Sequence, residues 1–155
     1  MDEISFTTFD KNNKDHIIAL KEMIKDEEIV KRFQGYLPRL NNPSPTIFNK
    51  GFWVTFDNTI IGYLDIGNYN KDEDCVYLRA AIFKEYRNKH FGTDMLKEAC
   101  NYIFTNYPFI NKIKLKIDND NIASQKVADN AGFKWEKDDY YYLDNPNVIK
   151  SNSLH

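Results

Sequence analysis

The chain has 155 residues, of which 42% are hydrophobic and 15% are aromatic. This is enough apolar side chain for one well-filled core and a short chain for two, so we expect a single domain over residues 1–155. The formal net charge of −2 gives no general attraction to phosphate backbones or to anionic lipids. We therefore expect neither a nucleic-acid partner nor a membrane partner.

The cysteines and the N-terminal segment indicate a reducing compartment. Cys75 and Cys100 fall inside a predicted strand and a predicted helix, and no further Cys or His stands at metal-ligand spacing. We interpret both thiols as small buried hydrophobic groups, and we expect no disulfide and no metal. No stretch has the length of a bilayer span, and the N-terminal residues lack the basic and apolar regions of a signal peptide. The prediction is a soluble, cytoplasmic protein.

The first part of the chain predicts a strand, a helical region and a loop. Residues 4–9 alternate between apolar and polar, which is typical of a strand. Apolar residues then recur at helical spacing from Asp15, the expected N-cap, to about Phe33. The charge run 25–28 marks either a break between two helices or a solvated face, and we favour the solvated face. The Pro-rich and Asn-rich segment 38–45 predicts a loop.

A hairpin and a long apolar strand come next. Residues 52–56 and 59–66 read as strands on either side of a tight turn at Asp57-Asn58. Residues 76–83 form the longest apolar strand of the chain, interrupted by Arg79. These three strands follow one another closely enough to be antiparallel neighbours.

The last part of the chain alternates helices and strands. Apolar spacing predicts a helix through 95–103, and residues 112–117 alternate Lys with Ile and Leu as a half-buried strand does. Residues 121–131 predict a short helix with Gly132 at its C-terminal end. Residues 133–143 form either one more strand or a hairpin. The element order predicts a mixed α/β fold with a mostly antiparallel central sheet and helices on both faces.

The stretch from Leu78 to Phe91 has the pattern of an anion site. An apolar strand runs into a basic, polar turn, and the turn opens an amphipathic helix. The first N–H groups of a helix have no partners within the helix, and its N-terminus favours negative charge. We therefore expect this stretch to hold a phosphorylated cofactor.

Two sequence blocks resemble the GNAT N-acetyltransferase superfamily. In AIFKEYRNKHFGTDML, Arg87 and Gly92 match the first and last positions of the family signature, which is Arg or Gln, two residues, Gly, one residue, then Gly or Ala. His90 stands where the first Gly is usual. About thirty residues later, the block from Asn121 to Phe133 is similar to the family pattern N-x-x-S-x-x-V-A-x-x-x-G-F. Its form with Ser and Ala is most similar to the branch of ribosomal-protein alanine acetyltransferases.

The resemblance implies acetyl-CoA as the cofactor, bound where the central sheet of the GNAT fold splays apart. Backbone groups of Ala81, Ile82 and Phe83 would pair with the pantetheine arm, and the Ile82 N–H would polarise the thioester carbonyl. The pyrophosphate would lie on the backbone of Asn88 to Thr93, with charge added by basic side chains. The residues implied to bind the cofactor are Ala81, Ile82, Phe83, Arg87, Asn88, Lys89, His90, Phe91, Gly92, Thr93, Asn121 and Ser124.

His90 leaves three possibilities open. Glycine at this position supplies a positive φ and lets the backbone approach the phosphates. With His90, either φ is negative there, or the loop lies further from the cofactor, or the imidazole itself meets a phosphate. Asn121 is equally natural as a helix N-cap and as the family's pantetheine-binding amide, and both roles are compatible.

The resemblance also implies which catalytic groups are missing. The glutamate that some family members use as a general base would fall at Val76, and the tyrosine that others use as a general acid would fall at Ala128. Ser124 is the remaining candidate to hydrogen-bond the departing sulfur. Tyr77 and Arg79 lie on the central strand and could face the acceptor, although a Tyr in a strand is more often a packing residue.

The predicted function is therefore transfer of an acetyl group from acetyl-CoA to a primary amine, by direct attack on the thioester. The acceptor is a peptide N-terminus or a small amine, and the chain is a monomer or a homodimer. Acidic residues such as Asp65 and Glu73 could attract a cationic amine, although scattered surface carboxylates are the commoner explanation. The alternative function is a non-catalytic acyl-CoA sensor or interaction module on the same fold.

Overall fold

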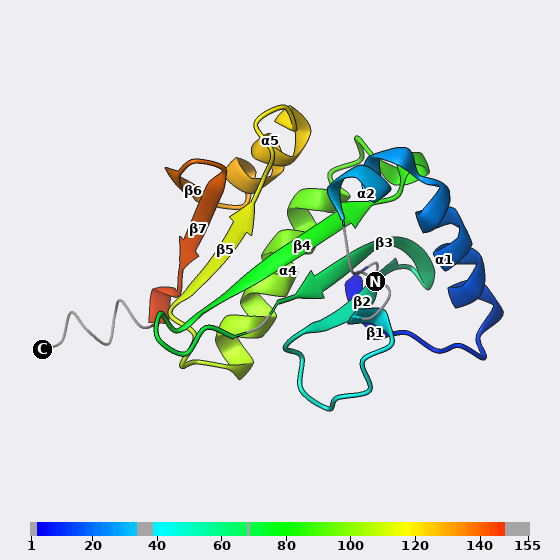
Figure 1. The fold of residues 1–155 in the computed structure, drawn as a ribbon, viewed down its shortest axis with the longest axis horizontal. Coiled ribbons are helices and arrows are strands. Elements are labelled where there is room, and N and C mark those ends of the chain that lie inside the picture. Colours follow the sequence, from blue (N-terminus) through cyan, green and yellow to red (C-terminus); the bar gives the residue numbers. More distant parts are fainter. Residues whose placement is uncertain (1–2, 34–38, 68, 148–155) are drawn as a thin grey trace, which may run out of the picture. The chain divides into compact units, whose positions relative to one another are not determined.

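The computed structural model describes residues 3–33, 39–67 and 69–147 (Figure 1). The strands are β1 Ile4–Thr8, β2 Lys50–Phe56, β3 Thr59–Ile66, β4 Cys75–Ile82, β5 Lys112–Lys116, β6 Lys134–Lys137 and β7 Tyr140–Asp144. The helices are α1 Lys14–Lys25, α2 Glu27–Arg32, the short 3-10 helix η1 Lys84–Tyr86, α4 Phe91–Asn106 and α5 Ile122–Asn130. The strands form one sheet in the order β1-β2-β3-β4-β5-β7-β6.

The sheet is mixed and mostly antiparallel, as predicted. Strand β2 pairs antiparallel with β1 and β3, and β7 pairs antiparallel with β5 and β6. The β4–β5 pair is parallel, and its register runs from Cys75↔Lys112 to Leu78↔Leu115. Strand β4 continues beyond this register to Ile82.

Both hairpin turns use positive φ values at Asn or Asp. Asp57 and Asn58 have φ of 50° and 64°, the left-handed pair that a two-residue hairpin turn needs, so the predicted turn is confirmed. Asp138 has φ of 49° between β6 and β7, so the C-terminal segment is the hairpin and not one strand. Gly132 has φ of 95° after α5, where the Phe133 N–H bonds the Ala128 carbonyl at 3.0 Å, as in a Schellman ending.

The N-terminal helical region differs from the prediction in two ways. The N-cap of α1 is Asn13 and not Asp15, since the Asn13 side chain accepts the N–H groups of Asp15 and His16. The charge run 25–28 is a break and not a continuous solvated face. Asp26 ends α1, and its carboxylate caps α2 by accepting the N–H groups of Glu28 and Ile29 at 3.0 and 3.2 Å.

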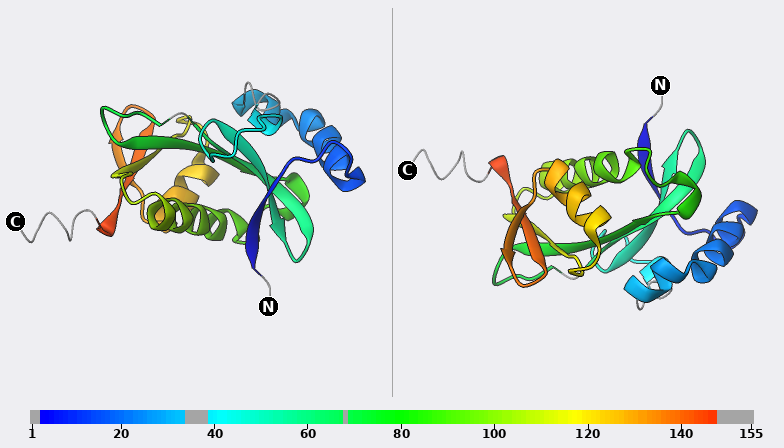
Figure 2. Two further views of the ribbon diagram at one scale, coloured as in Figure 1. Left: turned by 90° about the horizontal axis from the view of Figure 1, so that it is seen from below. Right: turned by 90° about the horizontal axis from the view of Figure 1, so that it is seen from above.

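The chain divides into two compact units, and the first comprises residues 1–66 and 79–92. Its helices α1 and α2 cover one face of β2 and β3 (Figure 2). The buried cluster under them is Ala19, Met23, Ile29, Phe33, Leu40, Trp53, Tyr63 and Phe83. Phe83, directly after β4, thus belongs to this aromatic core, and Ala81 of β4 packs against it. That the whole chain acts as one domain stays a prediction.

The second unit comprises residues 67–78 and 93–155. Helices α4 and α5 lie on the same face of β5, β6 and β7 (Figure 2). Helix α4 buries Met95, Leu96, Ala99, Cys100, Ile103 and Phe104. Both cysteines are free and buried, as expected from their positions in a strand and a helix.

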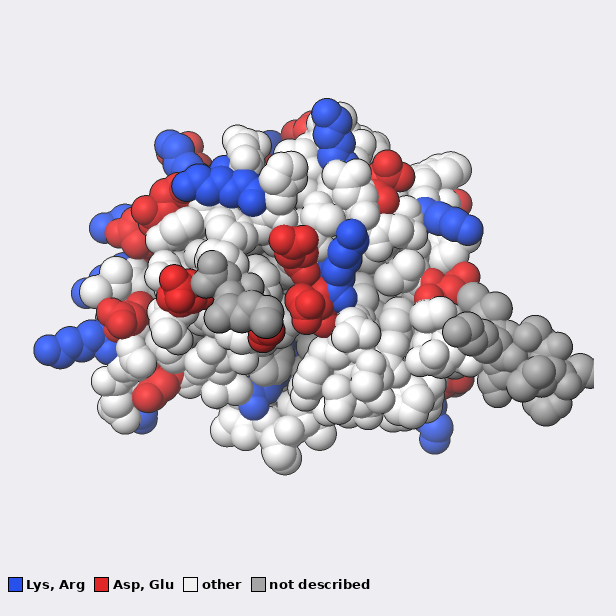
Figure 3. Space-filling model, turned by 180° about the vertical axis from the view of Figure 1, so that it is seen from behind, with Lys and Arg blue, Asp and Glu red and all other residues white. Residues whose placement is uncertain are grey.

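The charged side chains are mixed in sign over the face drawn in Figure 3, which matches the small net charge. Among the helices that the structure describes, none combines the length and the apolar character needed to cross a membrane.

Cys100 gives a pH-dependent prediction. Burial raises the pKa of its thiol from 9.0 to about 12. The unfolded chain therefore loses this proton at a lower pH than the folded chain, so the free energy of unfolding falls as pH rises from 9.0 to about 12. Relative to Cys100→Ala, we expect the wild type to lose about 1.4 kcal/mol more per pH unit in this range. Urea unfolding at successive pH values measures this, and two parallel stability curves would contradict it.

Candidate active site

The loop between β4 and α4 is built from a short helical turn followed by three exposed residues. The Tyr86 N–H bonds the Phe83 carbonyl at 2.8 Å, which closes η1 directly after the strand. Asn88, Lys89 and His90 follow and are exposed. The loop ends where the Phe91 ring packs on Phe56, with 4.8 Å between ring centroids.

His90 keeps the backbone conformation that a glycine would supply. Its φ is 67°, and that of Asn88 is 64°, both in the left-handed region. The possibility that His90 has a negative φ is therefore wrong. Lys89 between them does not have a positive φ, and such alternation is typical of the backbone nests that bind anions. The loop retains the expected shape in spite of the missing glycine.

The backbone N–H groups of this loop are available to a ligand. Within the described residues, those of Asn88, Lys89, His90, Phe91 and Gly92 donate no hydrogen bond. They precede or open α4, a helix of 16 residues whose N-terminus favours negative charge. The loop and helix end together have the donors that the pyrophosphate of acetyl-CoA needs.

Gly92 does not need the positive φ that often selects glycine. It is the second residue of α4, and its φ is not positive. Other residues can therefore adopt its conformation. What glycine provides here is room for a ligand to approach the backbone.

Arg87 points toward α1 and α2. Its Nε donates to the Ile82 carbonyl at 2.8 Å, and its Nη2 donates to Asp26 Oδ2 at 2.9 Å. An arginine has five N–H donors, so three remain for a phosphate. The sequence suggested a cofactor role for Arg87, and its bonds to Asp26 and Ile82 were not expected.

The end of β4 turns its backbone groups alternately to its two edges. The Tyr77 carbonyl accepts the Gly67 N–H at 2.7 Å, and the Phe83 N–H donates to the Ile61 carbonyl at 2.8 Å. Residues 77, 79, 81 and 83 therefore face β3, and Ile82 faces the opposite edge. Of the three residues expected to meet the pantetheine, Ile82 has the backbone orientation required.

Gly62 lets β3 and β4 approach closely at this point. The register of β2 and β3 shifts between Val54 and Thr55, which leaves Ile61 as an extra residue beside Gly62. A Cβ atom on Gly62 would lie 2.3 Å from the Ala81 carbonyl oxygen and 3.2 Å from the Ile82 Cα. Only a residue without a side chain fits against this part of β4.

A large cleft lies beside the same loop in the first unit. It has a volume of about 1270 Å³ and is lined by parts of α1, α2, the β2–β3 turn and residues Phe83 to Arg87. Its charged lining residues are the acids Asp15, Glu22, Asp26, Glu27, Glu28 and Glu85 and the bases Lys25, Lys84 and Arg87. Since acids outnumber bases by six to three, the field in the cleft attracts cations.

Asp65 is buried and paired, so it does not contribute to such a field. It is 1% exposed, and Arg79 holds it through Nη2 at 2.8 Å and through Nε at 3.1 and 3.2 Å. The Tyr63 hydroxyl donates to the same carboxylate at 2.8 Å. Burial, followed by the negative charge of Asp65, raises the pKa of Tyr63. Because Arg79 neutralises it, Asp65 is not one of the free carboxylates that would attract a cationic amine.

The second unit contains the other predicted site residues. Asn121 is the N-cap of α5 and accepts the Ser124 N–H at 3.2 Å, so its capping role is confirmed. Tyr77 stacks edge to face on Tyr140, with 6.2 Å between ring centroids, and burial raises its pKa. At neutral pH this phenol keeps its proton. Val76 and Ala128 are fully buried, as apolar side chains at those positions should be.

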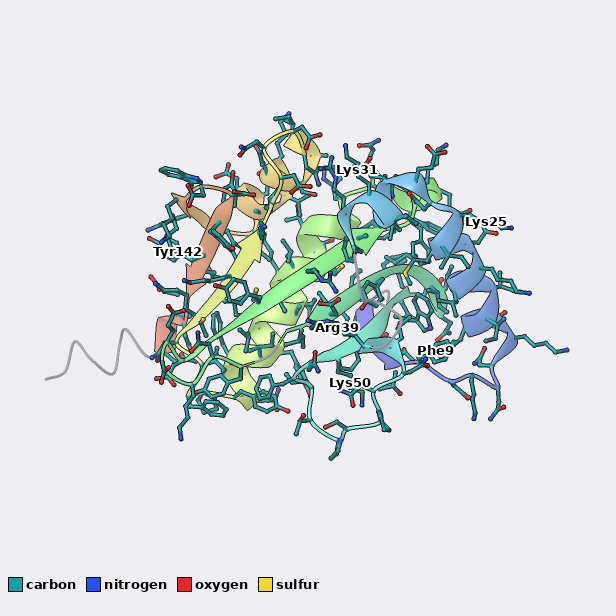
Figure 4. The ribbon with its side chains drawn as sticks, viewed as in Figure 1. Phe9, Lys25, Lys31, Arg39, Lys50 and Tyr142 are labelled. Atoms are coloured by element: carbon teal, nitrogen blue, oxygen red, sulfur yellow. The ribbon has the colours of Figure 1, made fainter. Side chains whose placement is uncertain are left out.

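Tyr77, Lys114 and Tyr142 share one face of the second unit's strands. The register pairs Tyr77 with Lys114 and Lys114 with Tyr142, and directly paired residues point to the same side. Figure 4 shows Tyr142 projecting from β7, and the Lys112 Nζ lies 4.7 Å from the centre of its ring. Of the run Tyr140 to Tyr142, the first and third residues therefore lie on this face.

The sequence reasoning missed Asp26 and Gly62. Asp26 was part of a charge run that suggested a solvated face, and its partner Arg87 is 61 residues away. An Asp inside a helical pattern is a possible N-cap, and this was the sequence signal that could have identified the role of Asp26. Gly62 is an isolated glycine inside a strand pattern, which is a known sign of a bulge or of close backbone approach.

A comparison with known protein families identifies the family of this chain. The Acetyltransferase (GNAT) domain family matches residues 8–134, and the chain belongs to this family. Membership confirms the acetyltransferase class, and acetyl-CoA is the cofactor of this class. Among curated protein sequences, none matches the chain.

Solved structures share the fold at low sequence identity. A GNAT acetyltransferase from Bacillus anthracis is 16% identical, with a TM-score of 0.73, over 92% of this chain and 95% of that one. The aminoglycoside acetyltransferase AAC(6')-Ib, solved with coenzyme A and kanamycin, is 15% identical with a TM-score of 0.70 over 98% and 99%. A Vibrio cholerae protein provisionally described as a ribosomal-protein-serine acetyltransferase is 18% identical, with a TM-score of 0.55. The match covers 61% of this chain and 63% of that one.

Gly62 provides a stability prediction for the strand that carries Ile82. In Gly62→Ala the new methyl group overlaps the Ala81 carbonyl, so the backbone of β4 must move. Overpacking of this kind costs about 1–3 kcal/mol, and we expect a loss of that size in chemical denaturation. An unchanged stability of Gly62→Ala would show that β3 and β4 do not approach as described.

His90 provides a second prediction. A β-branched residue is strongly disfavoured at positive φ, whereas glycine is not. We expect His90→Val to be about 1–2 kcal/mol less stable than His90→Gly, and His90→Gly to be close to the wild type. Chemical denaturation of the three proteins measures this order. If His90→Val were as stable as His90→Gly, the left-handed conformation of this residue would be refuted.

Proposed function

We propose that the protein is an N-acetyltransferase that moves the acetyl group of acetyl-CoA to a primary amine, by direct attack of the amine on the thioester. The observation that carries this proposal is the run of N–H groups from Asn88 to Gly92, at the N-terminus of α4, that donate no hydrogen bond to the described part of the chain. An anion with several oxygen atoms is the ligand such a run suits best.

Each part of the site has a distinct task in this proposal. The loop N–H groups bind the pyrophosphate, with Lys89 and the remaining donors of Arg87 adding positive charge. The Ile82 N–H, which faces away from β3, donates to the thioester carbonyl and stabilises the charge that develops on its oxygen. Asn121 and Ser124 keep the roles that the family resemblance implies, at the pantetheine arm and at the departing sulfur.

The acceptor is a primary amine, and the acidic cleft supports this class. Its excess of carboxylates concentrates ammonium ions next to Phe83 and Arg87, at the end of β4. With Val76 and Ala128 buried and apolar, neither family position supplies an acid or a base, so the amine loses its proton through water or arrives neutral. Both a peptide N-terminus and a small amine meet this requirement.

Similar folds with known ligands support the same reaction class. AAC(6')-Ib was solved with coenzyme A and kanamycin, which is an amine-bearing acceptor. RimL, a ribosomal L7/L12 α-N-protein acetyltransferase, has the fold at a TM-score of 0.69 and was solved with coenzyme A. The two acceptors differ in kind, so we leave the choice between peptide and small amine to experiment.

Two measurements test the proposal in order. Melting of the purified chain with and without millimolar acetyl-CoA should show an upward shift, because a ligand that binds only the folded state stabilises it. No shift would refute the proposal. Thiol release from acetyl-CoA across a panel of peptides, polyamines and aminoglycosides then tests turnover. Binding without any thiol release would favour the acyl-CoA sensor instead.

Gly92 tests where the cofactor lies. Because its φ is one that any residue adopts in a helix, Gly92→Ala and Gly92→Leu should fold normally and melt near the wild type. We expect the acetyl-CoA shift to decrease in Gly92→Ala and to disappear in Gly92→Leu, because the side chain blocks approach to the loop backbone. A full shift in Gly92→Leu would place the cofactor elsewhere.

A further inference from the structure

Arg87 connects three structural elements that meet at the end of β4. Its Nε bonds the carbonyl of Ile82 at 2.8 Å, and its Nη2 bonds the carboxylate of Asp26 at 2.9 Å. The Arg87 side chain is 32% exposed and that of Asp26 is 13% exposed. The pair is therefore partly shielded from water, and a charge-assisted bond in such a place is stronger than one on the open surface.

Asp26 is itself held in a fixed position. Its Oδ1 accepts the N–H groups of Glu28 and Ile29 as the N-cap of α2, which leaves Oδ2 for Arg87. Its own N–H bonds the Met23 carbonyl at 3.2 Å. The carboxylate is thus anchored to the junction of α1 and α2, and it fixes the guanidinium that it holds.

The Ile82–Phe83 peptide bond is held from both of its ends. Arg87 binds its carbonyl, and its N–H donates to the Ile61 carbonyl of β3 at 2.8 Å. In an extended strand the carbonyl and the N–H of one residue point to the same edge. By holding the Ile82 carbonyl, Arg87 also sets the direction of the Ile82 N–H.

We propose that Asp26 and Arg87 are positioning residues, which aim the Ile82 N–H at the thioester carbonyl by holding the Ile82 carbonyl. This inference rests on the proposed function, in which that N–H polarises the thioester. Asp26 acts only through Arg87. Loss of Asp26 should therefore impair the chemical step without weakening the hold of the loop N–H groups on the cofactor.

The variants are Asp26→Asn, Arg87→Lys and the double variant. Asp26→Asn keeps an oxygen for the α2 cap and removes the charge that holds Arg87. Arg87→Lys keeps the positive charge for a phosphate but loses the fork that reaches two acceptors. Glu98→Gln is the matched control, because this exposed residue of α4 lies outside the cleft lining, and the change removes one carboxylate charge without touching Arg87.

Three kinds of measurement are made on each purified protein: the Kd of coenzyme A by calorimetry, kcat and KM for acetyl transfer, and the amide hydrogen exchange of Phe83 without ligand. We expect Asp26→Asn to lower kcat about ten- to hundredfold and to change the Kd less than about twofold. Exchange at Phe83 should be faster in Asp26→Asn and Arg87→Lys, and unchanged in Glu98→Gln. The double variant should be no slower than the slower single variant, because the two residues act in series.

Several outcomes would overturn the proposal. If Asp26→Asn matched Glu98→Gln in kcat and in exchange, Asp26 would not position Arg87 for the reaction. If Arg87→Lys weakened coenzyme A binding in proportion to kcat, and its effect added to that of Asp26→Asn, Arg87 would be a phosphate ligand alone. A wild type that binds no coenzyme A refutes the proposed function instead, and hydrogen exchange still reports whether the Asp26–Arg87 pair orders β4.

Discussion

The Ile82–Phe83 peptide bond is the point on which the candidate site depends. Its N–H is bonded to β3 and its carbonyl to Arg87, so both ends of the peptide plane are fixed. The N–H bond requires β3 and β4 to approach closely, which Gly62 permits. The carbonyl bond requires Arg87 to turn back from the loop, which Asp26 secures. The end of β4, beyond the residues 75–78 that pair with β5, is thus held by Ile61 and Arg87.

Features set by short-range rules could be predicted from the sequence. The alternating pattern of 59–66 predicts β3 with its observed limits, and Asp57-Asn58 and Gly132 adopt the left-handed φ values that their turns need. Asp26 could not be placed in this way. Its role depends on an arginine 61 residues away, and a run of four charged residues is compatible with a solvated face as well as with a helix cap.

His90 shows what the glycine signature stands for physically. The sequence departs from the family pattern at this position, yet the backbone keeps φ of 67° there and 64° at Asn88. A left-handed residue with a side chain is strained by about 1–2 kcal/mol, and such strain persists where neighbouring structure enforces it. Here η1 fixes the loop at one end, and the packing of Phe91 on Phe56 fixes it at the other. The pattern therefore describes a backbone shape, which residues other than glycine can adopt when both ends are held.

The attraction for a cation follows from which carboxylates are already neutralised. Asp65 is held by Arg79, and Glu73 and Glu136 lie 3.7 and 3.4 Å from the Lys114 ammonium group. From the sequence alone, a paired acid cannot be told from a free one as a group that attracts a cationic amine. Of the six acids in the cleft, Glu28 is paired with Arg32 and Asp26 with Arg87, which leaves Asp15, Glu22, Glu27 and Glu85 with no ion pair among the described residues. Because a field at short range comes from charges without counter-charges, these four acids outweigh Lys25 and Lys84 and give the cleft between α1 and the end of β4 its attraction for an amine.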